Sequence, residues 1–184
     1  MTTSTQTQGL TGTWTIDPAH SLVEFSGKHM MFTTVKGRFR DLQGTISLDE
    51  ADHSRSSVEV EIQAGSIDSG VDQRDGHLKS PDFLDVENNP TITFKTTGVL
   101  PIGADRARVF GDLTIRGTTR PIELDVAYEG LGKNPWGKEV VGFSARTEIN
   151  RKDYGLTWNV ALEAGGFLVS DQVKIHLEVQ AVRA

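Results

Sequence analysis

The chain has 184 residues, no cysteine and a formal net charge of −6, with a pI of about 5.3. A chain of this length fits one domain, because all-β domains often remain undivided at about 200 residues. Without cysteine it can form neither a disulfide framework nor a thiolate metal site, and it has no cysteine nucleophile. The sequence is acidic and lacks the basic stripe that binding to a phosphate backbone needs, so nucleic acid is not an expected partner.

The first residues, MTTSTQTQGLTG, are mostly Thr, Ser, Gln and Gly, and they predict a disordered arm over residues 1–12. They contain neither the basic nor the apolar region of a secretory leader. No apolar run elsewhere approaches the ~18 residues of a membrane-spanning helix. We therefore expect a cytoplasmic protein, or a periplasmic or secreted one if a leader has been removed.

The clearest pattern in the chain is an alternation of apolar and polar residues with a period of two. Its apolar members in the three most regular segments are Val58, Val60 and Ile62; Ile122, Leu124, Val126 and Tyr128; and Val173, Ile175, Leu177 and Val179. Successive side chains of a strand point to opposite faces of its sheet. Each segment is therefore a predicted strand with one apolar and one polar face, as is typical of antiparallel sheets.

Six further segments fit the strand pattern less regularly: Thr13–Asp17, His20–His29, Val35–Leu48, Thr91–Val99, Arg106–Ile115 and Val140–Asn150. Pro and Gly residues separate most of them. The total of about eight or nine strands, several of them long, can pair as a sandwich or close as a barrel. Glycines inside the strands suit the bends of a barrel. No repeat or linker divides the pattern, so residues 13–184 form a single predicted domain.

One segment, Ser66–Pro90, breaks the alternation. It is polar and contains several Asp and Ser residues of the kind that begin helices. We predict a short helical insertion over about residues 72–84, made of a helix near Asp72–Lys79 and a turn near Pro81–Leu84. Long connections on a rigid scaffold often carry function. The segment is therefore either a lid at the mouth of the barrel or a crossover without a role of its own.

No catalytic motif stands out in the sequence. The chain has no G-x-S-x-G nucleophile elbow, no phosphate loop and no dinucleotide fingerprint. The histidines show no metal-ligand spacing, although ligands can converge from distant strands, and they are His20, His29, His53, His77 and His176. Carboxylate pairs occur in loops, where they are usually solvated. We expect no enzyme, no cofactor and no catalytic or metal-binding residue, and a convergent metal site is left open.

Two polar features could recognise the polar end of a ligand. Lys36, Arg38 and Arg40 share one face of a strand, where they either bind an anionic head group or form the solvated outer face. In the inserted segment, Arg74 and His77 could reach a ligand at the mouth of the barrel. The alternative for Arg74 is an ion pair with a nearby carboxylate that fixes the lid.

Several blocks of residues, in one order from Trp14 to the C-terminus, together resemble a known family. The blocks are Trp14-x-Ile16-Asp17-Pro18-x-His20-Ser21-x-x-x-Phe25; His29-Met30, then Val35-x-Gly37-x-Phe39 and Gly44; Arg74-Asp75-x-His77-Leu78-x-Ser80-x-x-Phe83-Leu84-Asp85; Pro90-x-Ile92-x-Phe94; Gly111-x-Leu113-Thr114-Ile115-x-Gly117-x-Thr119-x-Pro121; and Gly142-Phe143 before Asn150-Arg151-x-Asp153-Tyr154-Gly155. The sequence resembles the YceI-like, or polyisoprenoid-binding, proteins.

The resemblance implies an extended, eight-stranded antiparallel barrel similar to the lipocalins, with a long polyprenyl or quinone-like molecule in its lumen and no catalytic residues. An eight-stranded barrel is wide enough for one slim ligand. Strands of about ten residues give a tunnel of roughly 33 Å, which suits a long chain. Each buried CH₂ contributes about 0.8 kcal/mol, so a prenyl tail binds strongly without specific polar contacts.

We therefore expect a protein that carries, stores or sequesters an isoprenoid-type lipid. The alternatives are an enzyme acting on a lipophilic substrate in the same pocket and a structural barrel filled by its own side chains. The predicted ligand-binding residues combine the alternation with the resemblance and are Phe25, His29, Phe39, Arg74, His77, Phe83, Phe94, Phe143, Trp158 and Phe167. Transient contact with a membrane and a homodimer are both left open.

Overall fold

The computed structural model describes residues 9–184, so most of the expected N-terminal arm (residues 1–8) lies outside the described residues. The remainder of that arm is hydrogen-bonded to the barrel. The indole Nε1 of Trp14 donates to the Leu10 carbonyl at 2.9 Å, and Arg183 Nη1 donates to the Thr11 carbonyl at 3.0 Å. The ordered domain therefore includes these residues just before the first strand.

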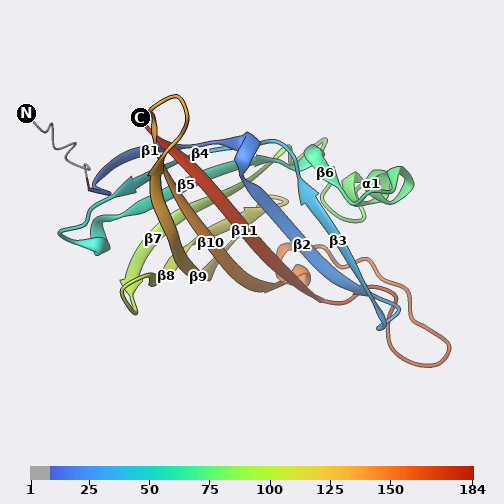
Figure 1. Cartoon of the computed structure of the whole chain (residues 1–184). Helices are drawn as coiled ribbons and strands as arrows, with labels where there is room; N and C mark the ends of the chain where they lie inside the picture. Colours follow the sequence, from blue (N-terminus) through green and yellow to red (C-terminus); the bar gives the residue numbers. More distant parts are fainter. Residues whose placement is uncertain (1–8) are drawn as a thin grey trace, which may run out of the picture.

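The regular structure of the described chain consists mainly of antiparallel strands (Figure 1). In chain order the elements are β1 (Gly12–Ile16), η1 (Pro18–His20), β2 (Leu22–His29), β3 (Thr33–Phe39), β4 (Leu42–Leu48), η2 (His53–Arg55), β5 (Ser57–Gln63), η3 (Ala64–Ser66), β6 (Ile67–Asp68), α1 (Asp72–Lys79), β7 (Thr91–Pro101), β8 (Arg106–Ile115), β9 (Thr118–Lys133), β10 (Glu139–Asn150), η4 (Arg151–Tyr154) and β11 (Gln172–Arg183).

The strands form one closed sheet. Their order is β1-β4-β5-β7-β8-β9-β10-β11-β2-β3-β6, and β1 also pairs with β11, which closes the ring. Three long strands of the barrel are each interrupted once. Their successive parts are β1 and β2, β3 and β4, and β5 and β6. Together with the five continuous strands β7 to β11 these three long strands make eight, and the predicted eight-stranded antiparallel barrel is confirmed.

Two of the interruptions have identifiable causes, one local and one distant in the chain. Asp17-Pro18 bends the chain between β1 and β2, because proline fixes φ and donates no hydrogen bond to a ladder. The segment Val35–Leu48, predicted as one strand, is instead broken at Arg40 and Asp41, whose backbone amides bond to the carbonyl and hydroxyl of Ser66 at 3.2 and 3.1 Å. At this break the wall changes direction. β3, which precedes the break, lies at the end of the barrel where α1 lies (Figure 1).

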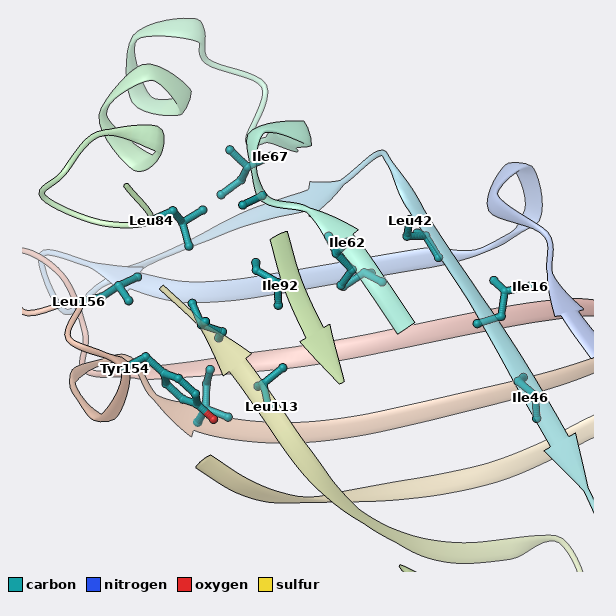
Figure 2. Packing of buried hydrophobic residues seen from close by; sticks show 14 of the residues in the cluster. Ile16, Leu42, Ile46, Ile62, Ile67, Leu84, Ile92, Leu113, Tyr154 and Leu156 are labelled. Atoms are coloured by element: carbon teal, nitrogen blue, oxygen red, sulfur yellow. The ribbon is translucent and has the colours of Figure 1, made fainter. Parts of the chain in front are cut away.

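The predicted register of the barrel wall is confirmed. All the alternating apolar residues predicted for the strands now called β5, β9 and β11 line the interior. Figure 2 shows Ile62, Ile92 and Leu113 pointing inward from neighbouring strands, beneath the inserted segment. A shift of one residue would have turned every such side chain outward.

The inserted segment caps one end of the barrel. The predicted helix near Asp72–Lys79 and the predicted turn near Pro81–Leu84 are both confirmed: α1 ends at Lys79, and hydrogen-bonded turns follow it as far as Asn89. We call residues 69–90 and 151–171 the lid end, and residues 49–57 and 101–106, at the opposite end of the strands, the turn end (Figure 1). Among the described residues, no helix is both long and apolar enough to cross a membrane.

Candidate functional site

A large cavity runs through the barrel from the lid end to the turn end. Its volume is about 1110 Å³, and its wall is the apolar inner face of the strands. Typical pockets for small ligands occupy about 300–1,000 Å³. A barrel filled by its own side chains would leave no such space. The interior therefore has room for a large apolar molecule.

Two aromatic rings shape this wall by lying over glycines on neighbouring strands. Phe25 of β2 faces Gly37 of β3, and a Cβ at Gly37 would collide with the Phe25 ring. On β7, the ring of Phe94 covers Gly111 of β8 in the same way. A strand glycine marks a close approach, and here an aromatic side chain fills the space above it. The rings thus lie flat against the wall instead of crossing the lumen.

The charged residues of the cavity wall are divided between its two ends. Among the described residues, the carboxylates that line the cavity are Asp49, Glu50 and Asp105, all at the turn end. At the other end, the lining includes Arg74 and Arg151, together with Lys28 from the adjacent end of β2. The turn end also carries Arg106, which forms an ion pair with Asp125. The lid end is therefore the end whose lining has cations and no carboxylate among the described residues, and it is the more favourable end for an anionic group.

Arg74 is anchored by a neighbouring serine, and no carboxylate of the described residues lies within ion-pair distance of it. Its Nε donates to Ser69 Oγ at 2.8 Å and its Nη2 donates to the Ser69 carbonyl at 2.9 Å. The backbone amide and hydroxyl of Ser69 in turn donate to the buried carboxylate of Asp75. The guanidinium is thus held at the cavity wall by hydrogen bonds that leave its positive charge without a direct counter-ion.

His77, Phe83 and Trp158 form an aromatic cluster that joins the insertion to the segment after η4. The ring of His77 packs edge-on against Trp158 at 4.6 Å and against Phe83 at 5.0 Å between centroids. Its Nε2 lies 2.8 Å from an Asp82 carboxylate oxygen. The cluster therefore ties the two parts of the lid together at the cavity wall, and the histidine ring already has a hydrogen-bond partner within the lid.

The structure brings most of the predicted ligand-binding residues to one cavity. Those that line it are Phe25, His29, Phe39, Arg74, His77, Phe83, Phe94, Phe143 and Trp158. Phe25 and Phe39 contact each other with ring centroids 5.6 Å apart, whereas His29 lies at the rim and bridges to Val169. Phe167 lies elsewhere, in the segment after Trp158, with 55% of its surface exposed and no part in the lining.

The sequence reasoning missed Arg151 as an organiser of this site. Its guanidinium is buried, and it donates hydrogen bonds to the carbonyls of Leu156 (2.6 Å), Trp158 (2.9 Å) and Ser170 (2.9 Å). Burial lowers the pKa of the arginine from its ordinary value, and the nearby Asp171 opposes that shift. A signal was present in Asn150-Arg151-x-Asp153-Tyr154-Gly155, because Asn150 caps the η4 turn and Gly155 ends it at a φ of 79°.

Metal-binding groups do not gather in the part of the chain that the structure describes. Within residues 9–184 there is no set of three or more His, Cys, Asp or Glu side chains placed to hold a metal ion. Two tyrosines are among the titratable residues that line the cavity. Burial raises the pKa of Tyr154 to about 12, and burial together with nearby Asp105 raises the pKa of Tyr128.

Fold and cavity together define a closed antiparallel barrel with a long apolar interior and one cationic end. The chain belongs to the YceI-like family, whose domain model matches residues 14–181. A UPF0312 protein of Azotobacter vinelandii is 35% identical over 164 residues, which cover 89% of this chain and 82% of the relative.

Solved structures have the same fold. The YCEI protein of Campylobacter jejuni is similar with a TM-score of 0.73 and 31% identity, covering 85% of this chain and 90% of that one. A polyisoprenoid-binding domain from Saccharophagus degradans has a TM-score of 0.72, with coverage of 93% of this chain and 98% of that domain. Its identity is 16%, so this second likeness concerns the fold alone.

Proposed function

We propose that the protein binds a long isoprenoid-type lipid, a polyprenyl or quinone-like molecule, with its tail in the barrel and its polar end beneath the lid. The observation that carries this proposal is the cavity of about 1110 Å³, which is apolar along its walls and cationic at one end. Such a binder would carry, store or sequester its lipid, and no step of the proposal requires catalysis.

The tail is expected to supply most of the affinity. Inward-facing Val, Ile, Leu and Phe side chains surround the lumen along the strands, and burial of each CH₂ of a ligand contributes about 0.8 kcal/mol. The wall offers few polar atoms between its ends, so it selects length and width rather than hydrogen-bonding groups. The polyisoprenoid-binding domain with the same fold supports the choice of a branched prenyl tail.

The head group is expected at the lid end. Within residues 9–184, the guanidinium of Arg74 has no direct counter-ion, and the carboxylates of the lining lie at the far end of the cavity. A phosphate or a quinone oxygen placed there would accept hydrogen bonds from a charged donor, which are stronger than those from neutral donors. The two ends of the cavity therefore assign a direction to the ligand.

The direct test is mass spectrometry of an organic extract of the purified protein, combined with a variant that fills the lumen. Val60 of β5 points inward, and Val60→Trp places an indole ring in the free volume. Its neighbour Glu59 points outward on the same strand, so Glu59→Trp is the matched control. We expect a co-purifying prenyl lipid in the parent protein and in Glu59→Trp, and at least about tenfold less in Val60→Trp.

Circular dichroism should show the same strand content in all three proteins. Equal lipid content in both variants would contradict binding in the lumen. An extract that contains only straight-chain lipids would overturn the isoprenoid assignment while leaving the cavity as the binding site.

A further inference from the structure

The end of the barrel beside the lid carries a protruding apolar tip. The turn between β2 and β3 exposes the consecutive residues Met30, Met31 and Phe32, and 80% of the Phe32 surface is accessible. The segment 159–169 lies alongside this turn, with the Met30 amide donating to the Leu168 carbonyl at 2.8 Å (Figure 1). Val160 and Phe167 of that segment are also exposed. We call these two segments together the hairpin tip.

The turn keeps its apolar side chains at a conformational cost. Met30 and Met31 have φ values of 49° and 66°, in the left-handed region that favours glycine and asparagine. Two successive positive φ values are the pattern of type I′ hairpin turns, for which Asn-Gly is the preferred sequence. Two methionines at these positions are unfavourable for folding. Strained residues gather at functional sites, so the exposed methionines call for a role outside the fold.

Positive charge follows the hairpin behind this tip although the protein as a whole is acidic. The hairpin from Phe25 to Arg40 contains two lysines and two arginines and no carboxylate, in a chain whose net charge is −6; Lys36 forms an ion pair with Glu24 and Arg40 with Asp68. The side chains of Lys28, Lys36, Arg38 and Arg40 are all exposed, so the shared face of β3 points outward and not into the lumen. Segment 159–169 adds one carboxylate, Glu163, so the Phe25–Arg40 hairpin and this segment together keep a positive formal charge, although the tip itself holds no lysine or arginine.

We propose that the hairpin tip docks on a lipid bilayer with anionic head groups. The exposed Met and Phe side chains enter the interface, and the cations of the β2–β3 hairpin lie among the phosphates. The residues Lys28, His29 and Leu168, at the base of the tip, also line the rim of the cavity. Docking would therefore hold the mouth of the cavity against a source of lipid, and this part of the inference rests on the proposed function.

The test is flotation with two kinds of vesicle, one of phosphatidylcholine alone and one of phosphatidylcholine with phosphatidylglycerol in a three-to-one ratio. The tip variant is Met31→Ser with Phe32→Ser. Its control is Trp136→Ser, because Trp136 is 82% exposed, as Phe32 is, but lies in the β9–β10 turn beside the C-terminus. We expect binding of the parent protein to the anionic vesicles, a loss of at least about tenfold in the tip variant, and no change in Trp136→Ser.

Two further variants separate insertion, charge and folding. Met30→Asn with Met31→Gly should raise the melting temperature by a few degrees because it suits the turn, and should weaken vesicle binding because it removes apolar side chains. Arg38→Gln should weaken binding about fivefold on anionic vesicles and should not alter it on neutral ones. Added salt should likewise weaken only the anionic case.

Equal losses in the tip variant and in Trp136→Ser would overturn the proposal. So would failure of the parent protein to float, or a change from dimer to monomer in the tip variant, which would assign the tip to a second copy of the chain. Lipid extracts of the same samples keep the two proposals distinct. Flotation without any co-purifying lipid contradicts the proposed function alone, and lipid without flotation contradicts the docking alone.

Discussion

The lid end and the turn end of the barrel close the same cavity by different means. At the turn end, short connections join neighbouring strands, and exposed ion pairs such as Arg106 with Asp125 (2.8 Å) lie on the surface. At the lid end, two long irregular segments cover the opening, and buried side chains hold them. Arg151 binds one segment through its backbone carbonyls, and Asp75 binds the other through Ser69.

This difference shows where the fold uses buried polar side chains to hold its backbone. Backbone ladders satisfy the strands, whereas an irregular segment has amides and carbonyls that need other partners. Buried charged groups are costly unless they are fully hydrogen-bonded, and they are usually confined to sites that need one defined shape. The lid end therefore has a fixed shape and a cationic wall, which is what the proposed head-group site requires. The turn end needs only to close the barrel.

The largest difference between the two ends should appear when an arginine is removed from each. Arg151→Met should lower the free energy of unfolding by about 3–5 kcal/mol, because several buried carbonyls lose their donor. Arg106→Met should cost less than about 1 kcal/mol, because its ion pair with Asp125 is exposed. Urea unfolding of both variants measures the contrast. Similar losses at the two sites would show that the lid does not depend on its buried arginine.

A smaller effect is expected when the charge beneath the lid is removed. Arg74→Ala should weaken binding of farnesyl phosphate by about ten- to a hundredfold, since a hydrogen bond to a charged group contributes about 1.5–3 kcal/mol. Binding of farnesol, which has the same tail and a neutral end, should weaken only a few-fold through the lost contact with Ser69. Arg106→Ala, at the turn end of the same cavity, is the control and should affect neither ligand.

Calorimetry with both ligands and the three proteins gives these affinities. Equal losses for farnesyl phosphate and farnesol, together with a marked fall in melting temperature, would make Arg74 a purely structural lid residue. A loss of phosphate binding in Arg106→Ala would instead place the head group at the turn end and reverse the direction of the ligand.

The barrel wall could be predicted from sequence because its signal is local. Alternation fixes which face of β5, β9 and β11 is apolar, and the inner wall follows directly from it. The break at Arg40 and Asp41 was missed because it depends on hydrogen bonds to Ser66. Ser66 is distant in the chain, and no periodic pattern in the sequence indicates these contacts. The predicted aromatic residues Phe25, Phe39, Phe94 and Phe143, which lie in the less regular segments and were chosen from alternation combined with the resemblance, also line the cavity.

The lid end was less predictable, because its contacts join segments far apart in sequence. Arg74 and His77 were recognised as candidates, but their partners Ser69, Asp82 and Trp158 follow no periodic spacing. Arg151 belongs to a motif of the family, yet its role as a donor to three carbonyls depends on how the following loop folds back. Irregular segments have no repeating pattern, so their packing has to be seen.

The smallest predicted effect concerns a tyrosine at the lid end. The hydroxyl of Tyr154 is buried and has no hydrogen-bond partner among the described residues. Leaving a buried hydroxyl unpaired costs free energy, so Tyr154→Phe should leave the free energy of unfolding at pH 7 unchanged or raise it by up to about 1 kcal/mol. Urea unfolding at pH 7 tests this, and a loss of more than about 1 kcal/mol would indicate a polar contact that the hydroxyl makes in solution.

The same substitution should also change the alkaline limit of stability. Burial raises the pKa of Tyr154 to about 12 from its ordinary value of 10.0, so the folded protein keeps this tyrosine neutral where the unfolded chain ionises it. The stability that this provides is complete below pH 10 and is lost progressively as the pH rises from 10 toward 12. Over that range the free energy of unfolding of Tyr154→Phe should therefore fall less steeply with pH than that of the parent protein. Tyr128→Phe, which removes a tyrosine near the turn end, is the control. It should retain the part of the pH dependence of the free energy of unfolding that Tyr154 causes. If the two variants have the same alkaline profile as the parent protein, Tyr154 ionises without cost and its burial is incomplete in solution.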